Sequence, residues 1–411
     1  MKRFFFLIVL LILLPLEGIT KPDKNKDVSF SKNDKIIIAS LINLSYLTEG
    51  KKGGDKTGVL KIRDKDIIGY INENLKEIEN SENSKKADYL IDKIKKYSDN
   101  QYFKDYVDGL KDFYSDNLKA YDLYKKWYSV KEGKTGFILI KQKQDKRYGL
   151  IIYKQEENKT DDFGKLLDYY KNFISILPID KEIFLKFPIL KKVIFVKPIY
   201  SYPGIKNIML YPPLNSKTID SERGIIVFEV LNEKREYGKR VEKYLKNIKK
   251  SGINREMITN FKIFHLIFHS IGPFYMEDEK SIIVKDRLKE FFYPIEEMKA
   301  ELLSYLFVDF LIKQGKLEQN GVETNFVIYL LNQKGKKGLY PISRNFLLNY
   351  LLDKGGIFME KNKIILNIQK ITPALSLLLS DIVEMEYKGD YVQAQKIIKK
   401  YGSFKFDIQG K

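Results

Sequence analysis

The stretch FHLIFHSIGPF, residues 264–274, holds the only two histidines of the 411-residue chain, His265 and His269. Apolar residues around them recur at helical spacing, which predicts a helix over 258–271. Residues four apart lie on one face of a helix, with β-carbons about 5–6 Å apart, and two imidazoles so placed can bind one zinc ion. The alternative is an ordinary buried helix with two histidines in the core.

A third zinc ligand would have to be Asp or Glu, because the chain has no cysteine and no further histidine. The stretch IEEMKAE, residues 295–301, offers three carboxylates. Neighbours in a helix point about 100° apart, so Glu296 and Glu297 cannot both face one metal, whereas Glu297 and Glu301 share a face. A carboxylate in such an apolar stretch is costly unless it is paired or metal-bound. The alternative is a solvated stripe of Glu and Lys299 on a surface helix.

Leu266 stands where a zinc peptidase with a His-Glu-x-x-His motif has its catalytic glutamate. That glutamate takes a proton from the attacking water and passes it to the leaving amine, and leucine can do neither. Efficient peptide hydrolysis is therefore not expected. Zinc alone can lower the pKa of a bound water to about 7, so weak hydrolysis stays open. A substitute base would have to be Tyr275, Glu277 or Glu279.

Hydrophobic periodicity divides the rest of the chain into a helical, a mixed and a second helical region, which predicts a mainly α, α+β fold. The mixed region contains a hairpin, a helix over 161–177 and three strands; the last region contains a long helix from about 285 to Gly315, a late hairpin over 355–368 and two closing helices. The expected divisions are 35–130, 131–231 and 232–402.

Residues 1–20, MKRFFFLIVLLILLPLEGIT, have the layout of a secretory signal peptide: a basic start, an apolar run and small residues near its end. The run is shorter than the roughly 20 residues of a membrane span, although an uncleaved anchor is the alternative. A polar linker over 21–34 would follow. Without cysteine, neither disulfides nor a lipid-bearing cysteine can form. We expect export to the periplasm or cell envelope of a bacterium.

The chain is strongly basic, with 73 Lys and Arg against 54 Asp and Glu and a formal charge of +19. Such a surplus could attract anionic envelope surfaces or nucleic acid. The lysines are scattered through amphipathic segments, without an Arg-rich cluster, which favours a solvated surface. No specific nucleic-acid binding is expected.

Several segments, in order, resemble the dipeptidyl peptidase III family of zinc metallopeptidases. HLIFHSIGP (265–273) and EEMKAE (296–301) are similar to stretches such as HELSHGLGP and EEAKAD of its bacterial members. Residues 214–245 and 346–402 resemble family segments before and after this pair. The resemblance implies two lobes about a wide cleft, one with a small β-structure and the other mainly helical and zinc-binding.

The resemblance also implies roles for individual residues. His265, His269 and Glu297 would bind zinc, Glu296 would orient a histidine, and the catalytic glutamate maps onto Leu266. A basic segment, FILIKQKQDKRYG over 137–149, stands where bacterial members have an acidic one near the substrate cleft. Other members are mostly intracellular, so an exported member would be unusual.

Three hypotheses follow for function. The first is an exported relative that keeps the fold and the metal, has little or no peptidase activity and binds peptides or serves the envelope. The second is an active zinc hydrolase with a substitute base. The third is a structural or adhesive surface protein in which His265 and His269 are core residues.

Overall fold

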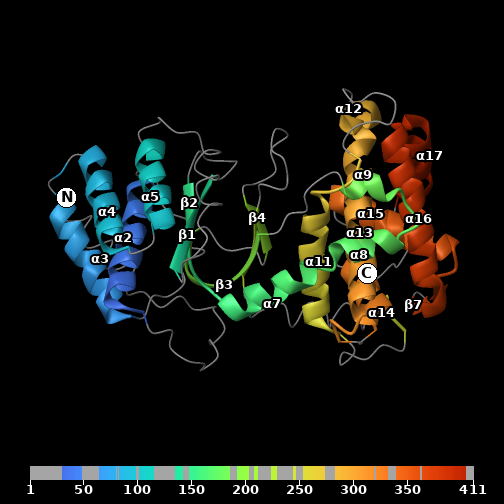
Figure 1. The fold of residues 1–411 in the computed structure, drawn as a ribbon, viewed down its shortest axis with the longest axis horizontal. Helices are drawn as coiled ribbons and strands as arrows, with labels where there is room; N and C mark the ends of the chain where they lie inside the picture. Colours follow the sequence, from blue (N-terminus) through green and yellow to red (C-terminus); the bar gives the residue numbers. More distant parts are fainter. Residues whose placement is uncertain are drawn as a thin grey trace.

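The computed structural model places two parts side by side, an N-terminal helical bundle with a sheet and a larger helical part (Figure 1). The residues that the structure describes are 30–48, 64–79, 81, 83–98, 101–114, 135–141, 148–185, 192–202, 208–211, 224–228, 244–246, 253–273, 283–318, 321–331, 339–361 and 363–403. The signal-peptide prediction for 1–20 lies outside them. Within the described ranges, no helix has the length and apolar character needed to cross a membrane.

The N-terminal bundle consists of helices in the region that periodicity predicted to be helical: α2 (Lys32–Thr48), α3 (Lys65–Ile78), α4 (Asn83–Tyr97) and α5 (Gln101–Tyr114). Asp64 caps α3 by accepting hydrogen bonds from the backbone N–H groups of Asp66 and Ile67. The buried isoleucines of α3, Ile67, Ile71 and Ile78, lie along one face. Helix α2 packs against both α3 and α4.

The described residues also form a five-stranded sheet in the order β1-β2-β3-β5-β4, from β1 (Thr135–Lys141), β2 (Tyr148–Gln155), β3 (Lys192–Tyr202), β5 (Gly224–Phe228) and β4 (Ile208–Tyr211). Strands β1 and β2 pair antiparallel, as the predicted hairpin requires, while β3 and β5 pair parallel. The register between β2 and β3 shifts beside Tyr153, whose partner is Pro198. A bulge suits this place because proline has no N–H to donate to the ladder.

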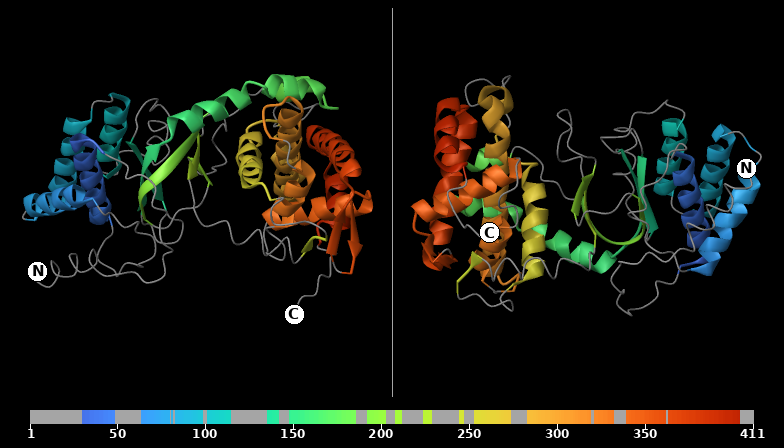
Figure 2. Two further views of the ribbon diagram at one scale, coloured as in Figure 1. Left: turned by 90° about the horizontal axis from the view of Figure 1, so that it is seen from below. Right: turned by 180° about the vertical axis from the view of Figure 1, so that it is seen from behind.

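Two helices connect the sheet to the helical part, where the sequence predicted one (Figure 2). Helix α7 (Glu157–Leu167) packs against β3, and α8 (Tyr170–Ile176) follows after a turn at Asp168 and Tyr169. The turn allows Phe163 of α7 to stack on Phe264, with ring centroids 5.1 Å apart, and Phe173 of α8 to meet Phe307 at 5.0 Å. A short helix, α9 (Lys181–Leu185), comes next.

The helical part is built around α13 (Phe292–Lys313), which packs against α11 (Arg255–Phe268), α14 (Val322–Leu331), α15 (Leu339–Asp353) and α16 (Ile368–Lys388). Helix α13 is buried from Pro294 to Ile312, so its apolar residues cover every face. Among the neighbours of α13, α11 lies on the side toward the sheet (Figure 1).

The long helix expected from about 285 to 315 is interrupted. A short α12 (Val284–Leu288) and a 3₁₀ turn (Lys289–Phe291) precede α13, and Lys289 has a positive φ of 50° at the break. The predicted stop is confirmed: Gly315 has a φ of 67°, and the N–H of Lys316 bonds to the carbonyl of Leu311.

The end of the chain follows the predicted pattern. Strands β6 (Ile357–Glu360) and β7 (Lys363–Leu366) pair antiparallel, and α16 and α17 (Tyr391–Tyr401) close the fold. Gly389, with a φ of 61°, separates these two helices. The sheet beside the N-terminal bundle and the mainly helical remainder confirm a two-lobed, mainly α, α+β fold.

Candidate metal centre

The histidine helix α11 begins at a side-chain cap and ends at the second histidine. The side chain of Asn254 accepts a hydrogen bond from the N–H of Met257, and its own backbone N–H donates to Asn325 of α14. His265 lies in the last turn of α11, and His269 is the C-cap residue, with a helical φ of −65° and ψ of −18°. The helical backbone therefore continues just far enough to keep both imidazoles on one face.

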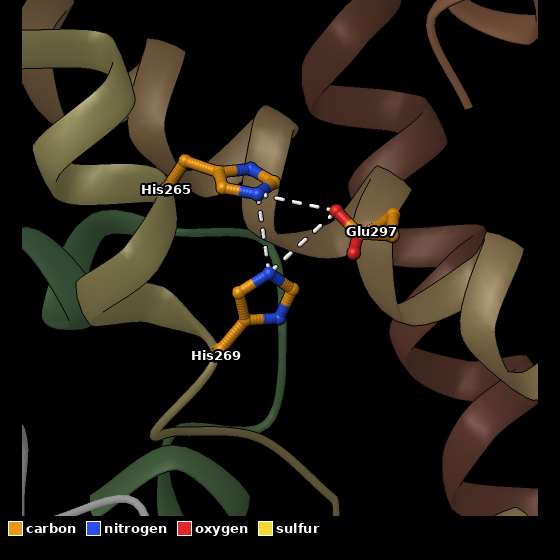
Figure 3. A group of neighbouring side chains, drawn as sticks. All are labelled: His265, His269 and Glu297. Carbon is orange, nitrogen blue, oxygen red and sulfur yellow. Dashed lines mark hydrogen bonds and ion pairs between the residues drawn. The ribbon is translucent and has the colours of Figure 1, made fainter. Parts of the chain in front are cut away.

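Glu297 of α13 meets the two histidines in the interior (Figure 3). Its Oε2 lies 3.1 Å from Nε2 of His265 and 3.6 Å from Nε2 of His269, and the two Nε2 atoms are 3.1 Å apart. One ligand atom from each of the three side chains lies within 4.8 Å of the others. The structure thus brings together the three residues that the resemblance implies as zinc ligands.

Two further carboxylates of α13 face the outer nitrogens of the imidazoles. Glu296 Oε1 is 3.1 Å from Nδ1 of His269, and Glu301 Oε2 is 3.5 Å from Nδ1 of His265. An ionised carboxylate only accepts, so with a metal on the two Nε2 atoms the proton of each imidazole would lie on Nδ1, beside Glu296 or Glu301. Glu296 is thus within hydrogen-bond distance of the ring of His269, whereas Glu301 approaches the ring of His265 at a longer ion-pair distance.

Nε2 of each histidine and a carboxylate oxygen of Glu297 converge on one point, which is the arrangement that a cation requires. Within the described part of the chain, Glu297 Oε2 is buried without a hydrogen-bond donor in proper geometry. Two neutral imidazoles and a carboxylate are a donor set that zinc accepts in proteins. The donor set therefore fits zinc, with three protein ligands, all of them buried.

The electrostatics of the three residues are mutually dependent. Burial disfavours charge on His269, but Glu297 and Glu296 outweigh it and raise the pKa of His269 to about 10. The pKa of His265 is raised against burial by Glu301 and Glu297. Burial would raise the pKa of Glu297, yet the histidines hold it below its usual range. Without a cation, protons on the imidazoles take the place of the missing positive charge.

Glu296 and Glu301 each contact a buried cationic side chain. Lys299 Nζ lies 2.5 Å from Glu296 Oε2 and 3.3 Å from Oε2 of Glu386 on α16. Arg344 Nε of α15 donates to Glu301 over 2.8 Å.

Arg344 also connects the site to α14. Its Nη2 donates to the hydroxyl of Tyr329 over 2.7 Å. Arg344, Tyr329 and Glu386 were not among the predicted site residues. A signal for two of them is present in the sequence, since Arg344 and Glu386 each stand in a largely apolar helical run.

The charges of this buried cluster point to a divalent ion. Its charged side chains, among the described residues, are Glu296, Glu297, Glu301, Glu386, Lys299 and Arg344. Four carboxylates and two cations would leave a charge of −2 if all were ionised and both histidines were neutral. Burial, together with Glu296, raises the pKa of Glu386 to about 8, so this carboxyl is largely neutral at pH 7 and the charge is nearer −1. A buried negative charge is unfavourable unless it is compensated, and a divalent cation would compensate it.

The position of a peptidase's catalytic base holds no proton acceptor. Leu266 is half-buried and packs against the apolar core. The three substitute bases considered from the sequence, Tyr275, Glu277 and Glu279, lie outside the described residues, as does the turn over 142–147 of the basic segment.

The fold that carries this site is similar to those of solved structures. No family model matches the chain. Dipeptidyl peptidase III from Caldithrix abyssi matches with a TM-score of 0.66 at 19% identity, over 79% of this chain and 67% of that one. Dipeptidyl-peptidase III from Corallococcus sp. strain EGB matches with a TM-score of 0.61 at 15% identity, over 79% and 65%.

A curated relative matches by sequence over a shorter stretch. Nudix hydrolase 3 of Arabidopsis thaliana is 28% identical over 147 residues, which are 34% of this chain and 19% of that protein. The chain thus spans about two thirds of the two peptidases and matches about a fifth of the plant protein. The resemblance stated from the sequence is confirmed by these structures and by the His-His-Glu cluster: the chain has the fold of dipeptidyl peptidase III.

Proposed function

We propose that this protein binds one zinc ion through His265, His269 and Glu297 and has weak or no peptidase activity. The observation that carries the proposal is the convergence of two Nε2 atoms and one carboxylate oxygen, with a carboxylate on the far side of each imidazole. Zinc, when bound, would supply a Lewis acid that polarises a carbonyl. The chain's own residues fix the imidazole tautomers and exclude bulk water from the ligands.

We expect weak activity because the nearby carboxylates already contact histidines or buried cations. Glu296 faces His269 and Lys299, and Glu301 faces His265 and Arg344. Glu386 contacts Lys299. Within the described residues, none of these is left to take a proton from water at the metal, and Leu266 cannot do so. The fold of a peptidase together with a missing base favours peptide binding over peptide cleavage.

Export and envelope association belong to the same proposal. They are supported by the signal-peptide layout of residues 1–20 and by the absence of cysteine, and the charge of +19 suits contact with anionic envelope surfaces. Fractionation of the source cells, followed by N-terminal sequencing of the mature protein, tests this point. Recovery of the full-length chain from the cytoplasm would contradict it.

Zinc content is the direct test of the metal site. The protein should be purified with a tag that contains no histidine and analysed for metals, alongside His269→Ala and the control Glu384→Gln, which alters an exposed carboxylate on α16. We expect one equivalent of zinc in the wild type and the control, and none in His269→Ala. Absence of zinc from the wild type, and no thermal shift on adding it, would favour the core-histidine hypothesis. Cleavage of a dipeptidyl-naphthylamide that disappears in His269→Ala would show an active hydrolase instead.

A further inference from the structure

A line of buried charges leads from the candidate ligand His269 to a helix more than 100 residues later in the chain. Nδ1 of His269 is 3.1 Å from Oε1 of Glu296, and the other oxygen of Glu296 is 2.5 Å from Nζ of Lys299. The same ammonium lies 3.3 Å from Oε2 of Glu386. Lys299 and Glu386 are both completely buried, so solvent screens neither contact. The four groups form a continuous relay through α11, α13 and α16.

The Lys299 ammonium is also enclosed by the backbone that follows the histidine helix. Gly272 lies three residues after His269, and a β-carbon there would be 2.5 Å from Nζ of Lys299. Its φ of 126° is a conformation that side-chain-bearing residues rarely adopt. Glycine at 272 therefore leaves room for the ammonium beside the ligand segment.

Glu386 holds the Lys299 ammonium from a second helix. Burial, together with the nearby Glu296, raises the pKa of Glu386 to about 8, so near neutral pH this group is a buried carboxyl more than a full negative charge. Its Oε2 lies 3.3 Å from Nζ of Lys299, which fixes the ammonium where it contacts Oε2 of Glu296. A fixed ammonium keeps the other oxygen of Glu296 directed at Nδ1 of His269.

We propose that Glu386 is a positioning residue for the metal centre, acting through Lys299 to hold the Glu296 carboxylate against Nδ1 of His269. This inference rests on the proposed zinc site. Outer groups that orient a metal-bound histidine typically change metal affinity by about 10–100-fold when they are altered. Glu386 acts at one further remove, so an effect of about tenfold is expected.

The test compares zinc dissociation constants for Glu386→Gln, Glu296→Gln and the double variant, with Glu384→Gln as the matched control on the same helix. Glu386→Gln should raise Kd about tenfold and the control should leave it unchanged. If Glu386 acts through Glu296, adding Glu386→Gln to Glu296→Gln should change Kd no further. Full additivity of the two substitutions would overturn the relay.

A second variant guards against a folding defect. Lys299→Met with Glu386→Met replaces a buried pair with apolar side chains that such sites often accept. A rise in Kd at least as large as that of Glu386→Gln supports positioning. Wild-type affinity in this variant would overturn the inference.

Histidine NMR supplies a readout that a merely structural role would not move. The chain has two histidines, so ¹⁵N-histidine labelling gives signals from His265 and His269 alone. In the zinc-loaded protein we expect Glu386→Gln to shift the Nδ1–H signal of His269 and leave that of His265 in place. If the wild type binds zinc and Glu386→Gln leaves both Kd and this signal unchanged, the role of Glu386 is wrong while the proposed zinc site stands. If the wild type binds no zinc, the proposed function fails as well.

Discussion

Nδ1 of His269 faces Glu296 at 3.1 Å while its Nε2 faces Glu297 at 3.6 Å, so neighbouring residues of α13 contact opposite edges of one imidazole. Side chains that follow each other in a helix point about 100° apart. From the sequence, this divergence implied that Glu296 and Glu297 could not both face one metal. In the structure, the same divergence lets the two carboxylates contact opposite edges of the His269 ring. One carboxylate sets the tautomer and the other completes the ligand set.

Zinc affinity and the stability of the metal-free protein should depend on pH in opposite directions. Without metal, the pKa of His269 is raised to about 10 from an ordinary value of 6.5. Its protonated form therefore adds stability that is fully present below about pH 6.5 and is lost as the pH rises toward 10. Zinc requires neutral imidazoles, so its affinity should fall as the pH falls.

Calorimetry in buffers of different ionisation enthalpy checks the first half of that prediction, since it counts the protons released per zinc ion. A value above zero at neutral pH is expected. Thermal unfolding with a chelator present, across the same pH range, checks the second half. Zinc binding without proton release would mean that the histidines are already neutral.

Leu266→Glu should restore peptidase activity if the remainder of the site is intact. The new carboxylate would stand one residue after His265, where peptidases of the His-Glu-x-x-His type have their base. Dipeptidyl-naphthylamide cleavage should rise above the wild-type background by at least about a hundredfold, the lower end of what a general base contributes. Leu266→Gln is the control, because it has a similar shape and no basic carboxylate. Equal rates for the two variants would place the defect elsewhere.

Arg344→Met should destabilise the protein strongly. It leaves Glu301, which is completely buried, without the guanidinium that contacts it at 2.8 Å, and breaking a buried pair in this way costs about 3–5 kcal/mol. Lys388→Met is the matched control, because its partner Glu384 is exposed and such pairs contribute about 0–1 kcal/mol. Urea unfolding with a chelator present measures both. Equal stability losses would show that Glu301 is accommodated without Arg344.

Two glycine-to-alanine substitutions should change the stability of the protein in opposite directions. Gly315 ends α13 with a φ of 67°, where alanine costs about 1–2 kcal/mol. Gly69 lies inside α3 with nothing within 4 Å of an added β-carbon, so alanine there should stabilise the helix by about 0.5–1 kcal/mol. Differential scanning calorimetry of the two variants gives both signs. Two shifts in the same direction would refute the backbone argument.

Local patterns predicted much of the fold because they act within a few residues. The β1–β2 and β6–β7 hairpins and the stop at Gly315 follow from alternation and turn chemistry, and the pairing of His265 with His269 follows from helical spacing. The break before α13 escaped prediction because apolar residues recur at helical spacing on both sides of it.

The long-range contacts around the metal centre could not be predicted from local patterns. Arg344 reaches Glu301 across 43 positions of the chain, and Glu386 reaches Lys299 across a still longer separation. Such pairs form only when α15 and α16 pack against α13, and tertiary packing leaves no local period in the sequence. What the sequence does show is a charged residue among apolar ones, which marks a need for a partner without naming it.

Phe264, the residue before the first histidine, receives the ring of Phe163 from the helix that leaves the sheet. Both rings belong to one continuous apolar core that also includes strand and helix residues from either side. The sheet and the histidine helix are therefore joined by packed side chains at the position next to His265, without an intervening solvent layer.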